Sequence, residues 1–261
     1  MGDRESRQSK MLEMIRSQNG ITISELKTVF GVSAVTIRKD LDDMEKDGLI
    51  VRTFGGAMPS QSSDPLESFN VRSRLCREEK RQIGLIAAGL IHPMESVIID
   101  AGSTTQEIVR HLHHSGPLTL ITPAINVALE ACNFQNVTVI VPGGGVLDRF
   151  TLSLEGASAE ESFSRLHADK VFVGVRGVDV THGLTDTDTR RIRLKQIMIE
   201  VSRQVIVVAD SSKIGKPSLF DVAPIQAVHT IITDSGIDSE MAARFKEMGV
   251  EILIADENQP A

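Results

Sequence analysis

Short side chains are followed by basic ones in the stretch from Ser33 to Lys39, where apolar residues recur at helical spacing. Ala34 and Thr36 are small enough to let a helix approach another molecule closely, and Arg38 and Lys39 carry positive charge. Such side chains on the first turns of a helix contact base edges and phosphates in the major groove of DNA. We therefore predict DNA contacts for Ser33, Ala34, Thr36, Arg38 and Lys39. The opposite face is predicted to be buried through Val35, Ile37, Leu41 and Met44.

The residues around this helix have the pattern of a winged helix-turn-helix domain. A first helix is expected over residues 7–18, and a second carries an apolar stripe of Ile23, Leu26, Val29 and Phe30. Gly31 ends the second helix and Ser33 caps the third. Residues 49–57 then form a short β-rich run that turns on a glycine pair, as a hairpin wing does, and Arg52 on it is predicted to contact phosphate. The alternative is a helical hairpin that is part of a larger core.

A second group of candidate residues follows the apolar runs of the remaining chain. Residues 100–105 (Asp-Ala-Gly-Ser-Thr-Thr) lead into a helix, so free backbone amides, a glycine and three hydroxyls converge at its positive end. This arrangement predicts a phosphate site, although a capped strand-to-helix turn remains open as the alternative. The predicted effector-binding residues are Asp100, Gly102, Ser103, Thr104, Thr105, Gly143, Gly144, Arg176, Arg191, Lys195 and Lys213.

Cations crowd the start of the helix expected over residues 190–203, where they oppose the helix dipole. Arg191 and Lys195 lie four residues apart beside its buried stripe, and Arg176 follows a strand that ends nearby in the expected sheet. A bound anion would explain this unfavourable arrangement. A solvated basic face explains it equally well.

Alternation of short β-branched runs with helical stretches predicts the architecture that positions these residues. Strands are expected at 97–100, 118–122, 137–141, 170–175, 205–210, 230–233 and 252–254, and helices at 78–90, 106–112, 126–132, 190–203 and 240–248. This order is typical of an α/β domain with a mostly parallel sheet and helices on both faces. Ligands of such sheets bind beyond the carboxyl ends of the strands, where the candidate residues lie.

Composition limits the other classes of function. The chain has 261 residues and a formal net charge of -7, but its first 58 residues contain nine basic and nine acidic residues, so the excess acid lies in the remainder. Cys76 and Cys132 are far apart and have no ligand-type neighbours, so neither a disulfide nor a metal site is expected, and no cofactor is indicated. No apolar run is long enough for a membrane span, and a cytoplasmic location is expected. The composition of residues 58–65 is that of a linker.

Over nearly its whole length the chain resembles the DeoR-type bacterial regulators of sugar metabolism. The resemblance rests on six motifs, at residues 32–41, 53–57, 100–105, 143–144, 166–170 and 209–213. It implies an effector domain related to ribose-phosphate isomerases, which senses a phosphorylated sugar and releases a repressor from its operator. It also implies effector contacts from residues 100 and 102–105, Gly143, Gly144, Lys195 and Lys213.

Three positions depart from the family pattern. Thr122-Pro123-Ala124 stands where Thr-Asn-Ser is common, Arg176 stands where an acidic or small residue is common, and Arg190-Arg191 stands where a Glu pair often precedes the helix lysine. These departures suggest the hypothesis that the pocket has gained positive charge and takes a sugar-acid phosphate or a bisphosphate. They also disfavour an enzyme, because a base that abstracts a proton needs a positioned carboxylate.

We therefore expect a winged helix-turn-helix domain at residues 1–57, a linker at 58–75 and an effector and oligomerisation domain at 76–261. The expected partners are double-stranded operator DNA, a phosphorylated sugar or sugar-acid effector and further copies of the chain in a dimer or tetramer. No catalytic residue is predicted. A second domain used only for oligomerisation is the remaining alternative, and the polar, glycine-rich strand ends argue against it.

Overall fold

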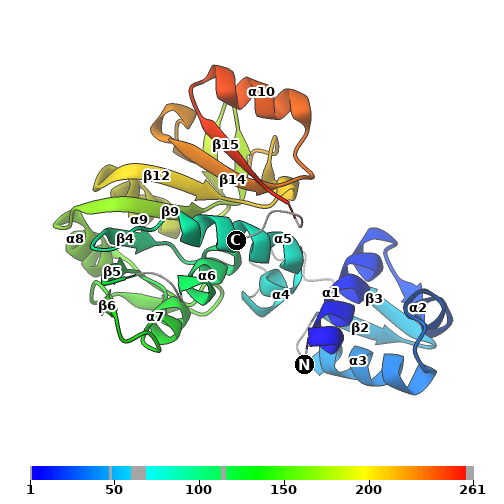
Figure 1. Ribbon diagram of the computed structural model, residues 1–261. Coiled ribbons are helices and arrows are strands. Elements are labelled where there is room, and N and C mark those ends of the chain that lie inside the picture. The colour runs from blue at the N-terminus through cyan, green and yellow to red at the C-terminus, as the bar shows by residue number, and fades with distance from the viewer. Residues whose placement is uncertain (1, 47–48, 60–68, 113–115, 257–261) are drawn as a thin grey trace. The chain divides into compact units, whose positions relative to one another are not determined.

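The computed structural model describes residues 2–46, 49–59, 69–112 and 116–256, which belong to two compact units, Met1–Arg77 and Glu78–Ala261 (Figure 1). The linker predicted for residues 58–75 falls in part outside the described residues. Met58 and Pro59 end a strand, and residues 69–74 form a helix, so neither end of that segment is irregular.

The first unit consists of helices around a small antiparallel sheet. Its elements are α1 (Gly2–Ser17), β1 (Ile21–Thr22), α2 (Ile23–Phe30), α3 (Ala34–Lys46), β2 (Ile50–Thr53), β3 (Gly56–Pro59) and α4 (Phe69–Arg74). The strands are ordered β1-β3-β2, and β2 and β3 form the predicted hairpin wing. The winged helix-turn-helix arrangement is therefore confirmed.

Local sequence signals explain where these helices begin and end. Thr22 caps α2 in a capping box with Glu25, and Gly31 ends it with a left-handed φ of 64°. The Ser33 hydroxyl accepts a hydrogen bond of 3.1 Å from the Thr36 amide at the start of α3, as predicted for a cap. Val71 on α4 is buried in the same apolar core as α1–α3, so α4 belongs to this unit.

Two residues predicted to be buried are exposed instead. Ile37, Leu41 and Met44 on α3 are fully buried, but Val35 is 72% exposed. Val35 precedes Ile37 by two positions, and residues two apart on a helix do not share a face. Val29 on α2, part of the predicted apolar stripe, is also exposed although Leu26, three residues before it, is buried, so the prediction was wrong for both valines.

The second unit is built on a parallel sheet of seven strands in the order β15-β14-β12-β9-β4-β5-β6. The strands are β4 (Ser96–Ile99), β5 (Leu118–Ile121), β6 (Val137–Ile140), β9 (Ala168–Gly174), β12 (Ser202–Val208), β14 (Thr230–Asp234) and β15 (Glu251–Ala255). All seven coincide with predicted strands, and every neighbouring pair is parallel. The predicted α/β class is therefore confirmed.

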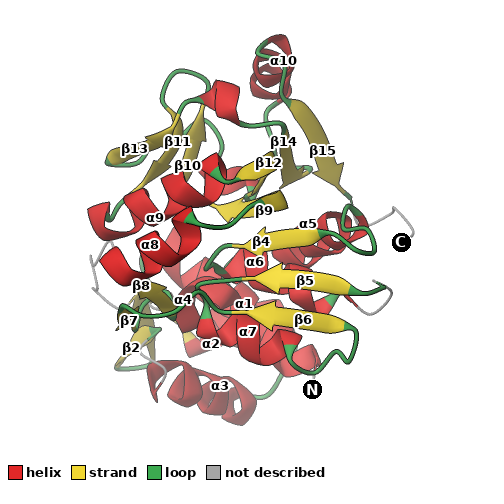
Figure 2. Cartoon of the chain, turned by 90° about the vertical axis from the view of Figure 1, so that its left-hand side faces the viewer, coloured by secondary structure: helices red, strands yellow, loops and turns green. Residues whose placement is uncertain are grey.

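Helices cover both faces of this sheet (Figure 2). They are α5 (Arg77–Gly89), α6 (Ser103–Arg110), α7 (Ile125–Ala131), α8 (Ala157–Ser164), α9 (Thr189–Glu200) and α10 (Ser239–Glu247). The core with α8, α9 and α10 takes Ile98 from β4, and the core with α5, α6 and α7 takes Val97 and Ile99 from the same strand. Side chains of one strand thus alternate between the two cores.

Two smaller sheets were not predicted. One is the hairpin of β7 (Val146–Asp148) and β8 (Ser153–Glu155). The other is an antiparallel sheet of β10 (Gly177–Asp179), β11 (Gly183–Asp186) and β13 (Phe220–Ala223). Both place acidic residues next to α9, and these acidic residues form part of the candidate site.

No helix in the described part of the chain combines the length and the apolar character that crossing a membrane requires.

Replacing Gly84 with Ala should destabilise the second unit, because α5 and α6 meet there. A Cβ atom at position 84 would lie 2.5 Å from the Cβ of Glu107 on α6, so the helices must separate. We expect Gly84→Ala to lower the free energy of unfolding by about 1–3 kcal/mol in urea titrations. Gly89, on the same helix, has no atom within 4 Å of its built Cβ, and Gly89→Ala is the matched control. Equal stability of the two variants would contradict this packing.

Candidate functional site

The exposed face of α3 carries the basic residues predicted to bind DNA. Arg38 and Lys39 are exposed, and neither side chain has a hydrogen-bond or ion-pair partner among the described residues. Ala34 and Thr36 are half-buried, and the Ser33 hydroxyl is engaged with Thr36 as the helix cap. The first turn of α3 contains no acidic residue. Only the first two turns of α3 therefore offer uncompensated positive charge to a phosphate backbone.

The acidic residues further along α3 are neutralised within the unit. Asp40 is buried and accepts hydrogen bonds from Arg7 at 2.7 Å and Arg4 at 3.1 Å, both on α1. Asp43 pairs with Arg4 and lies 3.9 Å from Lys46. These carboxylates thus join α3 to α1, and their pairing reduces their repulsion of a polyanion.

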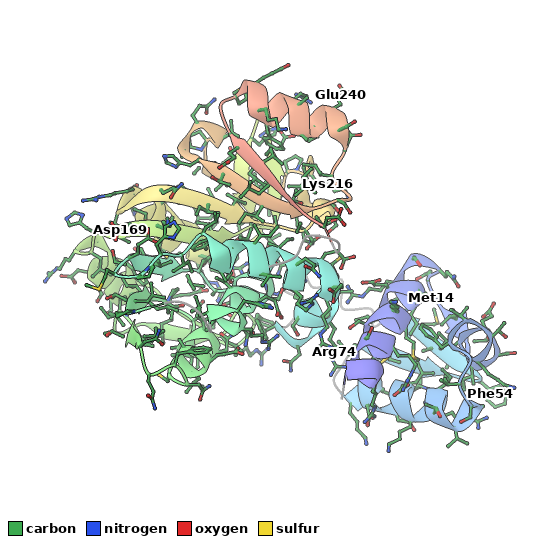
Figure 3. The ribbon with its side chains drawn as sticks, in the orientation of Figure 1. Met14, Phe54, Arg74, Asp169, Lys216 and Glu240 are labelled. Atoms are coloured by element: carbon green, nitrogen blue, oxygen red, sulfur yellow. The ribbon has the colours of Figure 1, made fainter. Side chains whose placement is uncertain are left out.

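Arg52, predicted to contact phosphate, holds the wing against α3. Its guanidinium pairs with Asp42 and donates hydrogen bonds to the carbonyls of Gly56 at 3.3 Å and Arg38 at 3.5 Å. Its positive charge is therefore shared with a carboxylate, and the phosphate contact stays a prediction. At the wing turn Phe54 is fully exposed (Figure 3).

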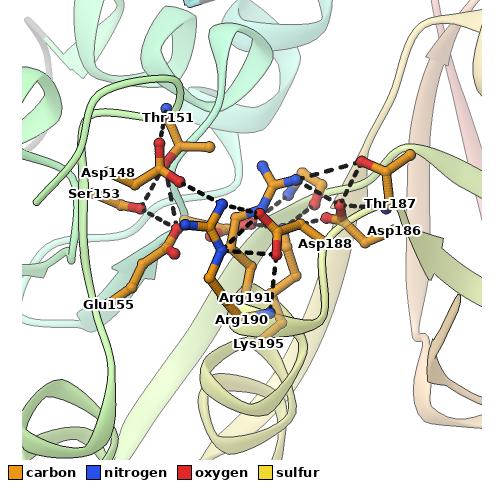
Figure 4. Close-up of polar contacts among 12 residues, drawn as sticks. Asp148, Thr151, Ser153, Glu155, Asp186, Thr187, Asp188, Arg190, Arg191 and Lys195 are labelled. Carbon is orange, nitrogen blue, oxygen red and sulfur yellow. Dashed lines mark hydrogen bonds and ion pairs between the residues drawn. The ribbon is translucent and has the colours of Figure 1, made fainter. Parts of the chain in front are cut away.

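In the second unit, charged side chains gather around the start of α9 and the ends of β4, β8 and β11 (Figure 4). We call this group the ionic cluster. It contains Asp100, Asp148, Glu155, Asp186, Asp188, Arg190, Arg191 and Lys195. Except for Arg190, these residues are all buried.

Lys195 lies at the centre of the ionic cluster. Its ammonium donates hydrogen bonds of 2.5 Å to Asp100 and to the carbonyl of Gly174, and it lies 3.8 Å from Asp186. Asp100 also accepts hydrogen bonds from the amides of Ala101 at 2.7 Å and Gly174 at 3.1 Å. Two predicted effector residues are therefore brought together, Asp100 directly after β4 and Lys195 on α9.

The arginines at the start of α9 are neutralised by the protein's own carboxylates. Arg191 donates a hydrogen bond of 2.9 Å to Asp186, and Arg190 lies 2.5 Å from Asp188 and 3.5 Å from Asp148. Asp188 is also the N-cap of α9, accepting from the Arg190 amide. The Arg190 hydrogen bond holds the pKa of the Asp188 carboxyl below its ordinary value. These carboxylates balance the cations at the start of α9. The crowding of cations there is therefore explained without a bound anion.

The cluster contains more acid than base. Five carboxylates face three cations in the cluster, and the hypothesis that the departures from the family pattern added positive charge to the pocket stays a prediction. Glu155 shows the consequence, because burial raises the pKa of its carboxyl and nearby Asp148 raises it further, against the lowering effect of a hydrogen bond from Ser153. No group of three or more His, Cys, Asp or Glu residues suited to a metal ion occurs in the described part of the chain.

Two cavities adjoin the cluster. A cavity of about 10 Å³ lies between Asp100, Glu155, Arg191 and Lys195, and this volume suits about one water molecule. A larger pocket of about 560 Å³ also has Glu155 in its lining and lies along the β7–β8 hairpin. Arg191 Nε is buried and has no hydrogen-bond partner. An unsatisfied donor beside a cavity is the feature of a site that accepts a ligand oxygen.

The start of α6 provides the predicted set of free amides. Gly102 is its N-cap and makes no side-chain cap hydrogen bond. Ser103 and Thr104 are buried, while the Thr105 hydroxyl donates to the Gly102 carbonyl at 3.0 Å. The first amides of α6 therefore lack a capping side chain and follow directly after Asp100.

Of the predicted effector residues, Asp100, Arg191 and Lys195 line the small cavity, and none lines the larger one. The Gly143 carbonyl accepts from Ser162 on α8, and a Cβ at Gly144 would lie 2.7 Å from the Cβ of Ser158, so Gly144 allows α8 to pack closely. Lys213 lies in a 3-10 turn after β12, and the Arg176 amide donates to Thr185. None of these four residues lines either cavity.

Sequence reasoning missed the acidic half of the cluster. Asp186 and Asp188 alternate with threonines just before the basic residues at the start of α9. Their closeness in sequence to these basic residues was the signal that could have identified them as ion-pair partners. Asp148 and Glu155 come from the β7–β8 hairpin, whose short strands gave no signal.

Comparisons with known proteins match both units. Residues 7–63 match the family model described as "DeoR-like helix-turn-helix domain", and residues 76–235 match "DeoR C terminal sensor domain". The chain is 34% identical to the "Putative aga operon transcriptional repressor" of Escherichia coli O157:H7, over 96% of this chain and 94% of that one. It is 32% identical to the "HTH-type transcriptional repressor GlcR" of Bacillus subtilis, over 98% of each. Ribose 5-phosphate isomerase A from Neisseria gonorrhoeae is similar over 52% of each chain, with 15% identity and a TM-score of 0.37.

Replacing Glu155 with Gln should stabilise the protein at neutral pH. Because the folded-state pKa of Glu155 is raised, the folded protein binds this proton more tightly than the unfolded chain does, and protonation favours folding. This stabilisation is present below pH 4.5, the ordinary value, and is lost as pH rises through the folded-state pKa. Urea unfolding should show Glu155→Gln more stable than the parent at pH 7, with the difference vanishing below pH 4.5. A variant less stable at pH 7 would refute this.

Proposed function

Because the chain belongs to the DeoR family of transcriptional regulators, we propose that it represses a carbohydrate-utilisation operon and leaves its operator when a phosphorylated sugar or sugar acid binds the ionic cluster. The family's members are DNA-binding regulators rather than enzymes, and α3 with its wing is the DNA-binding element. The unsatisfied Arg191 Nε beside a cavity in this cluster is the observation that carries the effector proposal.

The groups around the small cavity match a phosphorylated sugar. Asp100 and Glu155 accept hydrogen bonds from hydroxyl groups, while Lys195 and Arg191 donate to ligand oxygens. The uncapped amides at the start of α6 suit a phosphate, because the helix dipole adds to their attraction for an anion. A ligand with several hydroxyls and one anionic group satisfies both sets.

Charge favours one phosphate over two. With five carboxylates and three cations, each further negative charge on the ligand meets repulsion from side chains that are already buried and paired. A sugar monophosphate therefore suits the cluster better than a bisphosphate or a sugar-acid phosphate.

Ligand entry requires a change of conformation, and a regulator released by its effector also requires two conformations. The cavity of about 10 Å³ beside Arg191 is too small for a sugar, whereas the 560 Å³ pocket also reaches Glu155. Movement of the β7–β8 hairpin, which carries Glu155, would join the two. An effector shifts DNA affinity only if it binds the two conformations unequally, and this opening supplies that inequality.

DNA recognition by this chain calls for at least a dimer. Two copies of α3 related by a two-fold axis place their exposed faces in successive major grooves, and the operator then consists of palindromic half-sites. A dimer or a tetramer satisfies this geometry.

Replacing both Arg38 and Lys39 with Ala should abolish specific operator binding, with a loss of about a hundredfold or more, because these are the unpaired cations of α3. Binding is measured by fluorescence anisotropy on an operator selected from a random duplex library with the full chain. Lys46→Ala, on the last turn of the same helix, is the control and should bind nearly as the parent does.

Effector binding separates a contact role from misfolding in this experiment. The double variant should keep the parent's thermal shift with a sugar phosphate, because its second unit is unchanged. Unaltered operator binding by the double variant would contradict the assignment of these two residues.

A sugar monophosphate should raise the melting temperature of the full chain and weaken operator binding. At a hundred times its Kd, a ligand that binds only the folded state stabilises it by about 2.7 kcal/mol, which corresponds to roughly 5–10 °C. Melting temperatures are measured by differential scanning fluorimetry with a panel of ligands. The panel consists of hexose and pentose monophosphates, the matching bisphosphates and sugar-acid phosphates, the free sugars and inorganic phosphate.

Two results would count against the proposed effector. Stronger stabilisation by bisphosphates than by monophosphates would contradict the charge argument. A ligand that stabilises the protein without changing operator affinity would contradict its role in release.

A further inference from the structure

Val35 stands at the centre of the exposed face of the recognition helix. It is 72% exposed, and on a helix of about 3.6 residues per turn it shares that face with Lys39 and Asp42. The buried side chains Ile37, Leu41 and Met44 lie on the opposite side. The apolar branches of Val35 therefore point in the same direction as the unpaired cations.

Folding gives no reason for valine at this position. A side chain that is largely exposed gains little from burial, and β-branched residues form helices less readily than Ala does. Valine does have one strongly preferred rotamer in a helix, so its two methyl groups are held in place. A fixed apolar surface on this face is suited to contact with another apolar group.

We propose that Val35 reads a thymine methyl group in each half-site of the operator. The C5-methyl of thymine is the apolar group that bases present in the major groove, and apolar side chains that meet it distinguish thymine from other bases. The inference rests on the proposed function, since it requires that α3 enters the major groove.

Charge on α3 confines this contact to its first two turns. Asp42 and the later acidic residues lie away from the helix start, and the first turn has no acidic residue. Val35 belongs to that first turn, and Arg38, one turn further, suits guanine or phosphate on the neighbouring step. Helix N-terminal residues are those that reach base edges in this class of domain.

The test removes the C5-methyl group of thymine from the DNA and the two γ-methyl groups of Val35 from the protein. An operator is selected from a random duplex library with the full chain, and each thymine is replaced in turn by deoxyuridine, which lacks only the C5-methyl group. The Kd of each duplex is measured for the parent, for Val35→Ala and for Val29→Ala. Val29 is 57% exposed on α2, outside the recognition helix, and its variant is the matched control.

At one thymine per half-site, deoxyuridine should weaken binding of the parent and of Val29→Ala about fourfold, because burial of one methyl-sized group changes an equilibrium constant by about that factor. Val35→Ala should bind both duplexes equally. The salt dependence of its Kd should match the parent's, because no charge is removed.

The proposal is overturned if deoxyuridine weakens the parent and Val35→Ala equally at every thymine, or if the selected operator has no thymine. If Val35→Ala changes the oligomeric state in sedimentation but not the response to deoxyuridine, the valine packs against a second copy instead. A selection that enriches no sequence would contradict DNA recognition itself, and so the proposed function.

Discussion

The ammonium of Lys195 holds together the parts of the second unit that form the ionic cluster. It joins Asp100 after β4, the Gly174 carbonyl at the end of β9 and Asp186 at the end of β11. Both Lys195 and Asp100 are buried, so removal of Lys195 would leave the Asp100 carboxylate buried without its ion-pair partner. Such a loss costs about 3–5 kcal/mol in other proteins. The position of α9 relative to the strand ends is therefore fixed by charge pairing as well as by its apolar stripe.

The carboxylates of the ionic cluster occupy positions beside its cations that the oxygens of the proposed effector would also seek. Asp186 satisfies Arg191 and approaches Lys195, and Asp188 satisfies Arg190. A bound sugar phosphate has to add to this network or displace part of it. In the second case a carboxylate moves, and β11 or the start of α9 moves with it. Under the proposed function, the ion pairs that hold the cluster together are thus the interactions through which an effector would change the conformation of the unit.

The sequence predicted the elements whose pattern is set by burial. All seven parallel strands are apolar runs, the five inside the sheet lie between two cores, and the helix boundaries at Gly31 and Ser33 follow from left-handed backbone and capping. The β7–β8 hairpin and the sheet of β10, β11 and β13 were missed because their strands have only three or four residues and include glycine and aspartate. Val35 was misplaced because hydrophobicity was taken as burial. The acidic half of the site was missed because pairing with Arg190 and Arg191 depends on tertiary contacts.

The same rule distinguishes binding groups from structural ones in both units. Arg52 and Arg190 belong to the residue type that binds phosphate, yet Asp42 and Asp188 hold them. Arg38 and Lys39 differ because neither forms an ion pair among the described residues, the nearby Asp42 being paired with Arg52. Arg191 differs because one of its nitrogens remains without a partner beside a cavity. Residue type and spacing therefore identify where polar and charged groups gather. Those groups that remain unpaired within the protein are the ones that gain free energy by binding a ligand.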